Sequence, residues 1–272
     1  MSRISQCFEK LKADGQTALI PYITAGDPER WVTVPILHAL VDSGADLIEL
    51  GIPFSDPMSD GPAIQKACER ALKNEVSLDH VLAMVSQFRE KNNETPIVLM
   101  GYANPVEAMG YQSFAKQAEQ AGVDGVLIVD MPPEEADELL TVLNEHDIDT
   151  IFLVAPTTSE ERMAKIAEHA KGFIYYVSIK GVTGAAVVDV SEVTHKLSQL
   201  RQKTDLPLGV GFGIRDGKSA AAISEIADAV VVGSTLVNCI AEHLNRPEGI
   251  PSAVAGLLAE MRHAINARDM AK

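Results

Sequence analysis

The chain has 272 residues, 46% of them hydrophobic, and a formal net charge of -15. This length is compatible with one large α/β core, and the acidic charge argues against nucleic acid or an anionic membrane as a partner, because both would be repelled. Three widely spaced cysteines, Cys7, Cys68 and Cys239, give no disulfide framework or zinc motif and fit a reducing cytoplasm.

An amphipathic helix is predicted over residues 1–15, because Ile4, Phe8 and Leu11 recur at helical spacing between charged residues. This segment lacks the apolar core of a signal peptide, and no run of about eighteen apolar residues predicts a membrane span. We therefore expect a cytoplasmic protein.

Short apolar or β-branched runs then alternate with charged, amphipathic segments, the order typical of repeated strand–helix units. Eight strands are predicted, at Ala18–Thr24, Asp46–Ile52, Pro96–Tyr102, Gly125–Asp130, Thr150–Ala155, Phe173–Ser178, Pro207–Phe212 and Ala229–Gly233. Helices are predicted near residues 30–43, 62–73, 77–92, 111–121, 134–146, 159–170, 190–203, 217–226, 235–243 and 251–268.

This alternation predicts one α/β domain over residues 1–272, a single (β/α)8 TIM barrel with an extra N-terminal helix and a short phosphate-binding helix after the eighth strand. An open, doubly wound sheet is the alternative, but no Gly-x-Gly-x-x-Gly follows the first strand to mark a dinucleotide crevice. In such barrels the chemistry lies at the C-terminal ends of the strands and on the loops that follow.

The second predicted strand carries a carboxylate, Glu49, inside an apolar run, and an Asp- and Pro-rich loop follows it. Burying an unpaired carboxylate is costly or raises its pKa, so a catalytic role for Glu49 is expected, with Asp60 of the loop as its partner. Alternatively, Glu49 points outward to a surface lysine and the loop aspartates form turns or caps. For Asp56, which precedes Pro57, the turn role is favoured.

Two later strands also end in polar or aromatic residues. Asp130 is predicted to end the fourth strand and to have a supporting role. Tyr175 and Tyr176 should point to opposite sides of the sixth strand, one toward the barrel mouth and the other toward the helices. For either tyrosine alone, core packing is the simpler interpretation.

Glycine-containing loops follow the last three predicted strands. The irregular segment 179–186 is typical of a lid or binding loop. The segments 209–214 and 233–235 predict a phosphate cradle, since glycines let the backbone approach a ligand and amides at a helix N-terminus attract anions. Tight turns without a ligand are the alternative for each loop alone.

Five segments together resemble the α subunit of tryptophan synthase, namely Leu47–Pro62, Leu99–Pro105, Gly181–Ala185, Gly211–Gly213 and Gly233–Ser234. The resemblance spans almost the whole chain, and the Glu49 segment with its Pro-Phe-Ser-Asp-Pro loop is its specific part. It implies a lyase of tryptophan biosynthesis that cleaves indole-3-glycerol phosphate into indole and glyceraldehyde 3-phosphate by a retro-aldol reaction. It also implies an αββα heterotetramer, in which a β subunit carrying pyridoxal phosphate receives the indole, with no cofactor or metal in this chain.

The resemblance also assigns roles to individual residues. Glu49 and Asp60 match the catalytic pair. Substrate contacts are implied at Tyr175, Thr183, Tyr22 and Phe212, and phosphate-binding amides at Gly184, Gly213, Gly233 and Ser234. The partner is expected to rest on Phe54, Asp56 and Pro57 and on a neighbouring turn at Asn104 and Pro105.

Two other functions stay open at this stage. One is another enzyme on the same barrel, such as a sugar-phosphate isomerase or epimerase, which would require a basic residue or a metal at the ring centre. The other is a non-catalytic subunit that binds a phosphorylated ligand. An assay of indole release would separate the three.

Overall fold

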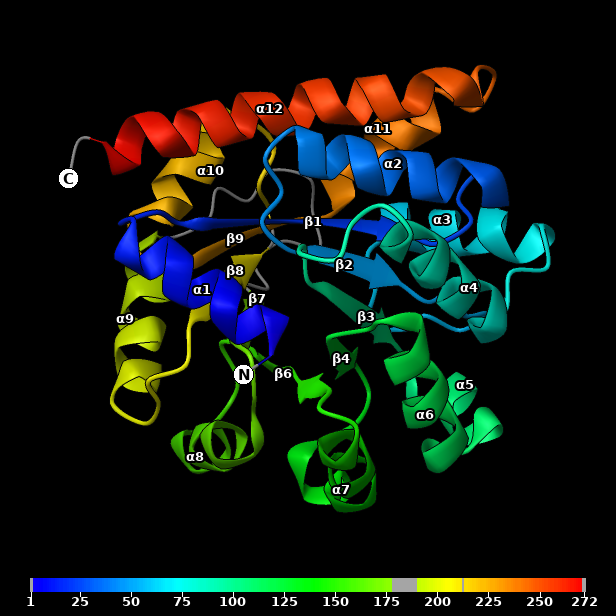
Figure 1. Ribbon diagram of the computed structural model, residues 1–272. Coiled ribbons are helices and arrows are strands. Elements are labelled where there is room, and N and C mark those ends of the chain that lie inside the picture. Colours follow the sequence, from blue (N-terminus) through cyan, green and yellow to red (C-terminus); the bar gives the residue numbers. More distant parts are fainter. Residues whose placement is uncertain (1, 178–189, 212, 271–272) are drawn as a thin grey trace.

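The strands of the computed structural model form a parallel barrel inside a layer of helices (Figure 1), and the model describes residues 2–177, 190–211 and 213–270. The described strands follow the order β5-β4-β3-β2-β1-β9-β8-β7-β6, and neighbours in this order are parallel. Their bounds are β1 (Ala18–Thr24), β2 (Ile48–Gly51), β3 (Ile97–Gly101), β4 (Gly125–Ile128), β5 (Asp149–Thr150), β6 (Phe152–Val154), β7 (Ile174–Val177), β8 (Leu208–Gly211) and β9 (Ala229–Val232).

The barrel is nearly closed by the predicted fifth strand, which is divided into β5 and β6. The first half pairs with β4 and the second half pairs with β7. Between the halves, the amide of Ile151 donates to the carbonyl oxygen of Val126 on β4 at 2.9 Å. Residues 149–154 therefore connect β4 to β7, the two strands between which the barrel closes. The predicted (β/α)8 barrel is confirmed, with its fifth strand divided in two.

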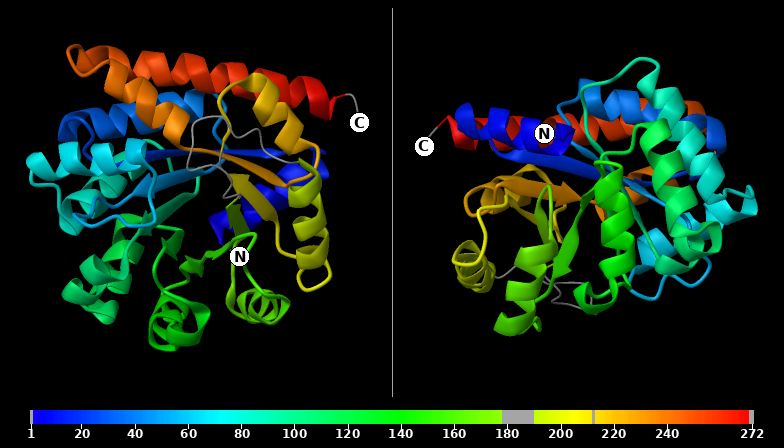
Figure 2. Two further views of the ribbon diagram at one scale, coloured as in Figure 1. Left: turned by 180° about the vertical axis from the view of Figure 1, so that it is seen from behind. Right: turned by 60° about the horizontal axis from the view of Figure 1, so that its bottom comes forward.

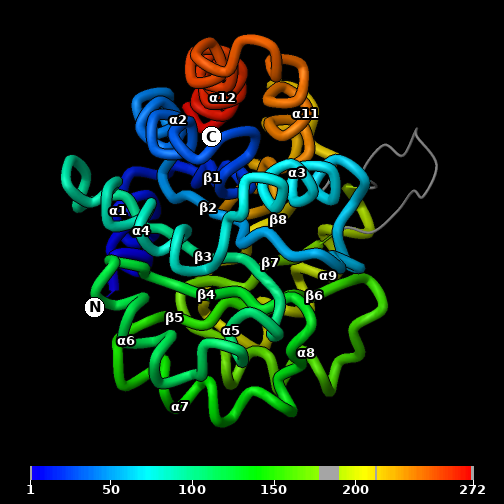
Figure 3. The backbone as a smooth tube through the Cα atoms, turned by 90° about the vertical axis from the view of Figure 1, so that its right-hand side faces the viewer, coloured from blue at the N-terminus to red at the C-terminus, as the bar shows by residue number. Residues whose placement is uncertain are grey.

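Helices surround the barrel (Figure 3). Their bounds are α1 (Arg3–Ala13), α2 (Arg30–Asp42), α3 (Pro62–Lys73), α4 (Leu78–Arg89), α5 (Ala103–Met109), α6 (Tyr111–Ala121), α7 (Asp137–Glu145), α8 (Glu160–His169), α9 (Val190–Arg201), α10 (Gly217–Ser224), α11 (Ser234–Glu242) and α12 (Ile250–Asp269), with short 3-10 helices η1 (Pro133–Glu135) and η2 (Pro247–Gly249). Within the described residues, none of these helices combines the length and the apolar character that a membrane crossing requires.

Alternate side chains of the strands fill the barrel interior, as the two-residue repeat of a strand requires. The interior includes Ile20, Val98 and Leu127, and the N-terminal helix α1 packs Ile4 and Phe8 against this cluster. Figure 2 shows α1 lying across the strands at the base of the barrel. The predicted amphipathic helix is thus confirmed, and the barrel has its open end where the strands finish.

Three aspartates reinforce the base of the barrel, each one or two residues before a strand. A carboxylate oxygen of Asp46, Asp124 and Asp228 accepts the backbone amide at the start of the preceding strand, from Leu19, Ile97 and Leu208 respectively, each at 2.8 Å. An arginine from an outer helix completes each site, namely Arg262 of α12, Arg89 of α4 and Arg201 of α9. These groups fix neighbouring strands at the end opposite the loops that follow the strands.

Three local predictions were wrong. Asn104 and Pro105 lie in the first turn of α5, where proline is tolerated, and not in an irregular turn. The helix predicted at 134–146 begins as η1, and α7 starts only at Asp137. The fourth strand ends at Ile128 and not at Asp130. The carboxylate of Asp130 accepts the amide of Ala103 at 2.8 Å at the start of α5, which agrees with its predicted supporting role.

Candidate active site

Glu49 projects from β2 into the barrel interior and is only 2% exposed. Its inward direction follows from the strand repeat, because its neighbours Ile48 and Leu50 pack on the outer side with the helices. Within the described residues, Oε1 of Glu49 has no hydrogen-bond partner. Burial, and then the negative charge of Asp60, raise the pKa of Glu49 to about 8. The side chain therefore holds a proton at neutral pH, and the alternative of an outward contact with lysine does not occur.

Asp60 lies on the loop between β2 and α3, close enough to Glu49 for their charges to interact. Burial raises the pKa of Asp60 to about 6, and a hydrogen bond from Tyr102 opposes that rise. The Tyr102 hydroxyl donates to Oδ2 of Asp60 at 3.1 Å and accepts the amide of Ser59 at 3.1 Å. Asp60 is therefore largely ionised at pH 7, while Glu49 is largely neutral.

Tyr102 is the site residue that the sequence analysis missed. It follows β3 directly, and its ring stacks on Phe54 of the loop between β2 and α3 with ring centroids 5.2 Å apart. The available signal was its position, since an aromatic residue at the end of a barrel strand lies at the face where such enzymes hold their substrates.

Two tyrosines border the carboxylates from other strands. Tyr22 on β1 is in register with Glu49, and a Cβ atom on Gly51 would overlap the phenol oxygen of Tyr22. Tyr175 on β7 has the same relation to Gly211 on β8. Burial, and after it the charges of Glu49 and Asp60, raise the pKa of Tyr175 well above its usual value. Tyr176, the next residue, packs instead with the outer core, so the predicted opposite directions are confirmed.

The loops after β8 and β9 meet at the start of α11. Gly213 has a φ of 76°, a left-handed conformation that favours glycine. Gly233 is the N-cap of α11 and Ser234 is its first residue. The hydroxyl of Thr235 donates to the carbonyl oxygen of Ile214 at 2.5 Å, which joins the two loops. The structure thus brings Gly213, Gly233 and Ser234 to neighbouring loops, where a helix N-terminus offers amides to an anion.

The predicted partner residues lie on two adjacent segments. Phe54, Asp56 and Pro57 belong to the loop between β2 and α3, and Asn104 and Pro105 lie in α5. The carbonyl oxygen of Asp56 accepts the amide of Met58 at 2.8 Å, as expected of a turn. The side chain of Met58 is 78% exposed. Three further predicted residues, Thr183, Gly184 and Phe212, lie outside the described residues.

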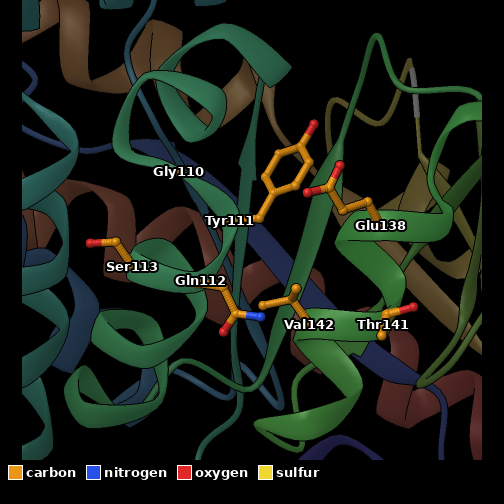
Figure 4. A pocket seen from close by; sticks show the side chains of 7 residues that line it. All are labelled: Gly110, Tyr111, Gln112, Ser113, Glu138, Thr141 and Val142. Carbon is orange, nitrogen blue, oxygen red and sulfur yellow. The ribbon is translucent and has the colours of Figure 1, made fainter.

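A surface pocket of about 620 Å³ lies elsewhere, between the start of α6 and α7 (Figure 4). Its lining contains none of the residues predicted for the site and consists of Gly110, Tyr111, Gln112, Ser113, Glu138, Thr141 and Val142. This pocket is separate from Glu49 inside the barrel and from Asp60 on the loop that follows β2.

Comparison with known proteins gives one consistent result. The family model described as "Tryptophan synthase alpha chain" matches residues 8–266. The tryptophan synthase alpha chain of Thioalkalivibrio sulfidiphilus is 62% identical over 266 residues, covering 98% of this chain and 100% of that protein. The same protein from Nitrosococcus oceani is 58% identical over 269 residues, with 99% of each chain covered.

Solved structures agree with the sequence relatives. The α subunit of tryptophan synthase from Legionella pneumophila has a TM-score of 0.91 at 48% identity, with 98% of this chain and 99% of that chain covered. A chain of the aminoacrylate-bound tryptophan synthase from M. tuberculosis has a TM-score of 0.87 at 35% identity, with 97% and 100% covered.

Proposed function

The chain belongs to the tryptophan synthase alpha chain family, and on that premise we propose that Glu49 and Asp60 carry its reaction. The enzyme catalyses the α reaction of tryptophan biosynthesis, the retro-aldol cleavage of indole-3-glycerol phosphate into indole and glyceraldehyde 3-phosphate. The observation that supports the residue assignment is the pair of carboxylates in one site with pKa values raised to about 8 and about 6. Two carboxyl groups in different environments can take different roles in acid–base chemistry.

In the proposed mechanism, Glu49 acts first as an acid and then as a base. Its proton passes to C3 of the indole ring, and the positive charge that develops at the ring nitrogen is stabilised by the Asp60 carboxylate. The bond between C3 and the glycerol carbon then breaks, and its electrons return to the ring. The hydroxyl on that carbon gives its proton to Glu49 as the aldehyde forms, so the carboxyl group ends the cycle protonated.

Binding is proposed to use the remaining residues of the barrel mouth. The amides of Gly213, Gly233 and Ser234 would hold the phosphate, together with Gly184 from outside the described residues. Tyr22, Tyr175, Phe212 and Thr183 would contact the rest of the substrate. Because backbone amides supply the donors, the site binds a dianion without a lysine despite the net charge of -15.

The proposed partner is a β subunit that carries pyridoxal phosphate, in an αββα heterotetramer that passes indole between the subunits in the cytoplasm. The exposed Met58 is an apolar side chain on the loop of Asp60 that a partner could cover. Asn104 and Pro105 lie at the start of α5, two and three residues after Tyr102. Phe54 stacks on Tyr102, which in turn donates to Asp60. A partner that presses on Phe54 is thereby linked to a catalytic carboxylate through two contacts.

The function is tested by indole release from indole-3-glycerol phosphate in the presence of the cognate β subunit. The wild-type chain should produce indole, and Glu49→Gln should lower the rate by about 10²–10⁴-fold, the usual range for loss of a general acid or base. Asp79→Asn, at the exposed start of α4, is the matched control and should leave the rate unchanged. Near-native turnover by Glu49→Gln would refute the assignment of Glu49.

A further inference from the structure

The side chain of Tyr22 extends from Gly233, at the proposed phosphate site, to Gly51, near Glu49. At one end, a Cβ atom on Gly233 would lie 3.7 Å from Cβ and Cδ1 of Tyr22. At the other end, the phenol oxygen occupies the space above Gly51, two residues beyond Glu49 on the same face of β2. A substrate whose phosphate lies at Gly233 and whose reacting carbon lies at Glu49 must run beside this ring.

The hydroxyl of Tyr22 lies 3.2 Å from Oγ1 of Thr24, and the two groups form one hydrogen bond in which either can be the donor. Tyr22 is 4% exposed and Thr24 is fully buried. Two hydroxyl groups carry two hydrogens, and their mutual bond uses only one of them. The pair therefore retains a hydrogen that can be donated to a third group in the site.

Tyr22 can serve as that donor throughout the working pH range. Burial raises its pKa well above the usual value and outweighs the hydrogen bond with Thr24, which lowers it, so the phenol stays protonated. When Thr24 donates to Tyr22, the phenol hydrogen is free to turn toward a ligand oxygen. The ring of Tyr22 packs with Ala67 and Val237. This packing does not use the hydroxyl, so a purely structural role would not require it.

We propose that the Tyr22 hydroxyl donates a hydrogen bond to a hydroxyl oxygen on the three-carbon chain of the substrate and makes the site selective for a hydroxylated chain. This inference rests on the proposed function, since it takes the positions of the phosphate and of Glu49 from it. A site that hydrogen-bonds a substrate hydroxyl rejects an analogue without it, because the buried group is then left unpaired.

The test compares two ligands that differ only in those hydroxyls. The probes are indole-3-glycerol phosphate and an indole that carries an unsubstituted propyl phosphate chain. Their dissociation constants are measured by calorimetry on the full chain with its β subunit, in a Glu49→Gln background that prevents turnover. Tyr22→Phe should weaken binding of the glycerol compound by about tenfold and leave the propyl compound unchanged, as expected for loss of one hydrogen bond.

Thr24→Val supplies an independent test, because it keeps the Tyr22 ring and removes only the group that orients its hydroxyl. It should produce a smaller loss that is again confined to the glycerol compound. Tyr111→Phe, which removes a phenol hydroxyl bonded to Glu107 away from the site, should change neither ligand. Equal losses for both ligands, or no loss for either, would overturn the proposal. Failure of the wild-type chain to release indole would instead refute the proposed function, so the two failures are distinguishable.

Discussion

The phenol oxygen of Tyr102 lies 3.1 Å from Oδ2 of Asp60 and 3.1 Å from the amide of Ser59, so one hydroxyl just after β3 contacts the loop between β2 and α3 at two points. The ring of the same residue stacks on Phe54. Asp60 is therefore positioned by a residue that follows a different strand, and this contact lowers the pKa of Asp60.

Tyr102→Phe should lower kcat/KM by about tenfold, the typical effect of losing a hydrogen bond to a charged group. Burial raises the pKa of Asp60 to about 6, and the Tyr102 bond holds it below the value that burial alone would give. Removing the hydroxyl should therefore shift the acid limb of the pH–rate profile to higher pH. The measurement is kcat/KM against pH, with Tyr111→Phe as the control. An unchanged acid limb would show that Asp60 does not set it.

Glu49→Gln should gain stability in alkaline solution while it loses activity. Burial raises the pKa of Glu49 from 4.5 to about 8 on folding, so the folded chain binds this proton more tightly than the unfolded chain. Stability associated with this group is complete below about pH 4.5 and is lost as the pH rises through about 8. Urea unfolding at pH 8.5 should give the variant the larger free energy of unfolding, and the difference should shrink toward pH 5. A wild-type chain that is equally stable at both pH values would contradict this.

Gly213→Val should raise KM by about tenfold or more and change kcat less, because a side chain there blocks the close approach of the phosphate. Gly110→Val is a matched control for backbone strain, since Gly110 also has a positive φ, 81°, and lies outside the proposed site. Both variants should lose stability, but only Gly213→Val should weaken substrate binding. A ligand complex with the phosphate at Arg215 and Lys218, remote from Gly213, would refute the proposed cradle.

The isolated chain should release indole slowly, and its β subunit should increase the rate by about 5- to 150-fold, the range typical of coupling between two sites. The physical reason is the path from Phe54 through Tyr102 to Asp60, which lets an external contact on the loop favour the catalytic position. The rates are compared at saturating substrate with complex formation measured separately. Phe54→Ala should reduce this activation. Equal rates with and without bound β subunit would remove the coupling and leave the lyase function in place.

Asp124→Asn should destabilise the fold by about 3–5 kcal/mol, because it leaves Arg89 buried without its counter-charge. The Asp124 carboxylate lies 2.6 Å from Arg89 and 2.7 Å from Arg3. Glu134→Gln is the control, since its 3.6 Å pair with Arg162 is exposed and should contribute less than about 1 kcal/mol. Thermal and urea unfolding measure both changes, and similar small losses in the two variants would disprove a structural role for the buried pair.

The sequence supported the barrel and the carboxylate pair because both depend on local patterns. The apolar run around Glu49 indicated a buried strand, and the two-residue repeat then placed its side chain inside the barrel. Contacts between distant segments were not accessible in the same way. The division of the fifth strand at Ile151 arises from pairing with both β4 and β7, and the role of Tyr102 depends on where the loop of Asp60 folds. Pro105 is interpreted from the sequence as part of an irregular turn, but proline is equally compatible with the first turn of a helix, so the residue alone does not distinguish the two.

The aspartates before β2, β4 and β9 bind the strands at the base of the barrel, while the groups proposed for catalysis lie on β2 and on the loop that follows it. Because the two sets of residues are separate, the loops can change in sequence without loss of the contacts at the base of the barrel. Substitutions that alter the preferred substrate can accumulate among the upper loops without weakening the bonds that maintain the barrel. Directed evolution toward other indole compounds should therefore begin in these loops, and should leave Asp46, Asp124 and Asp228 untouched.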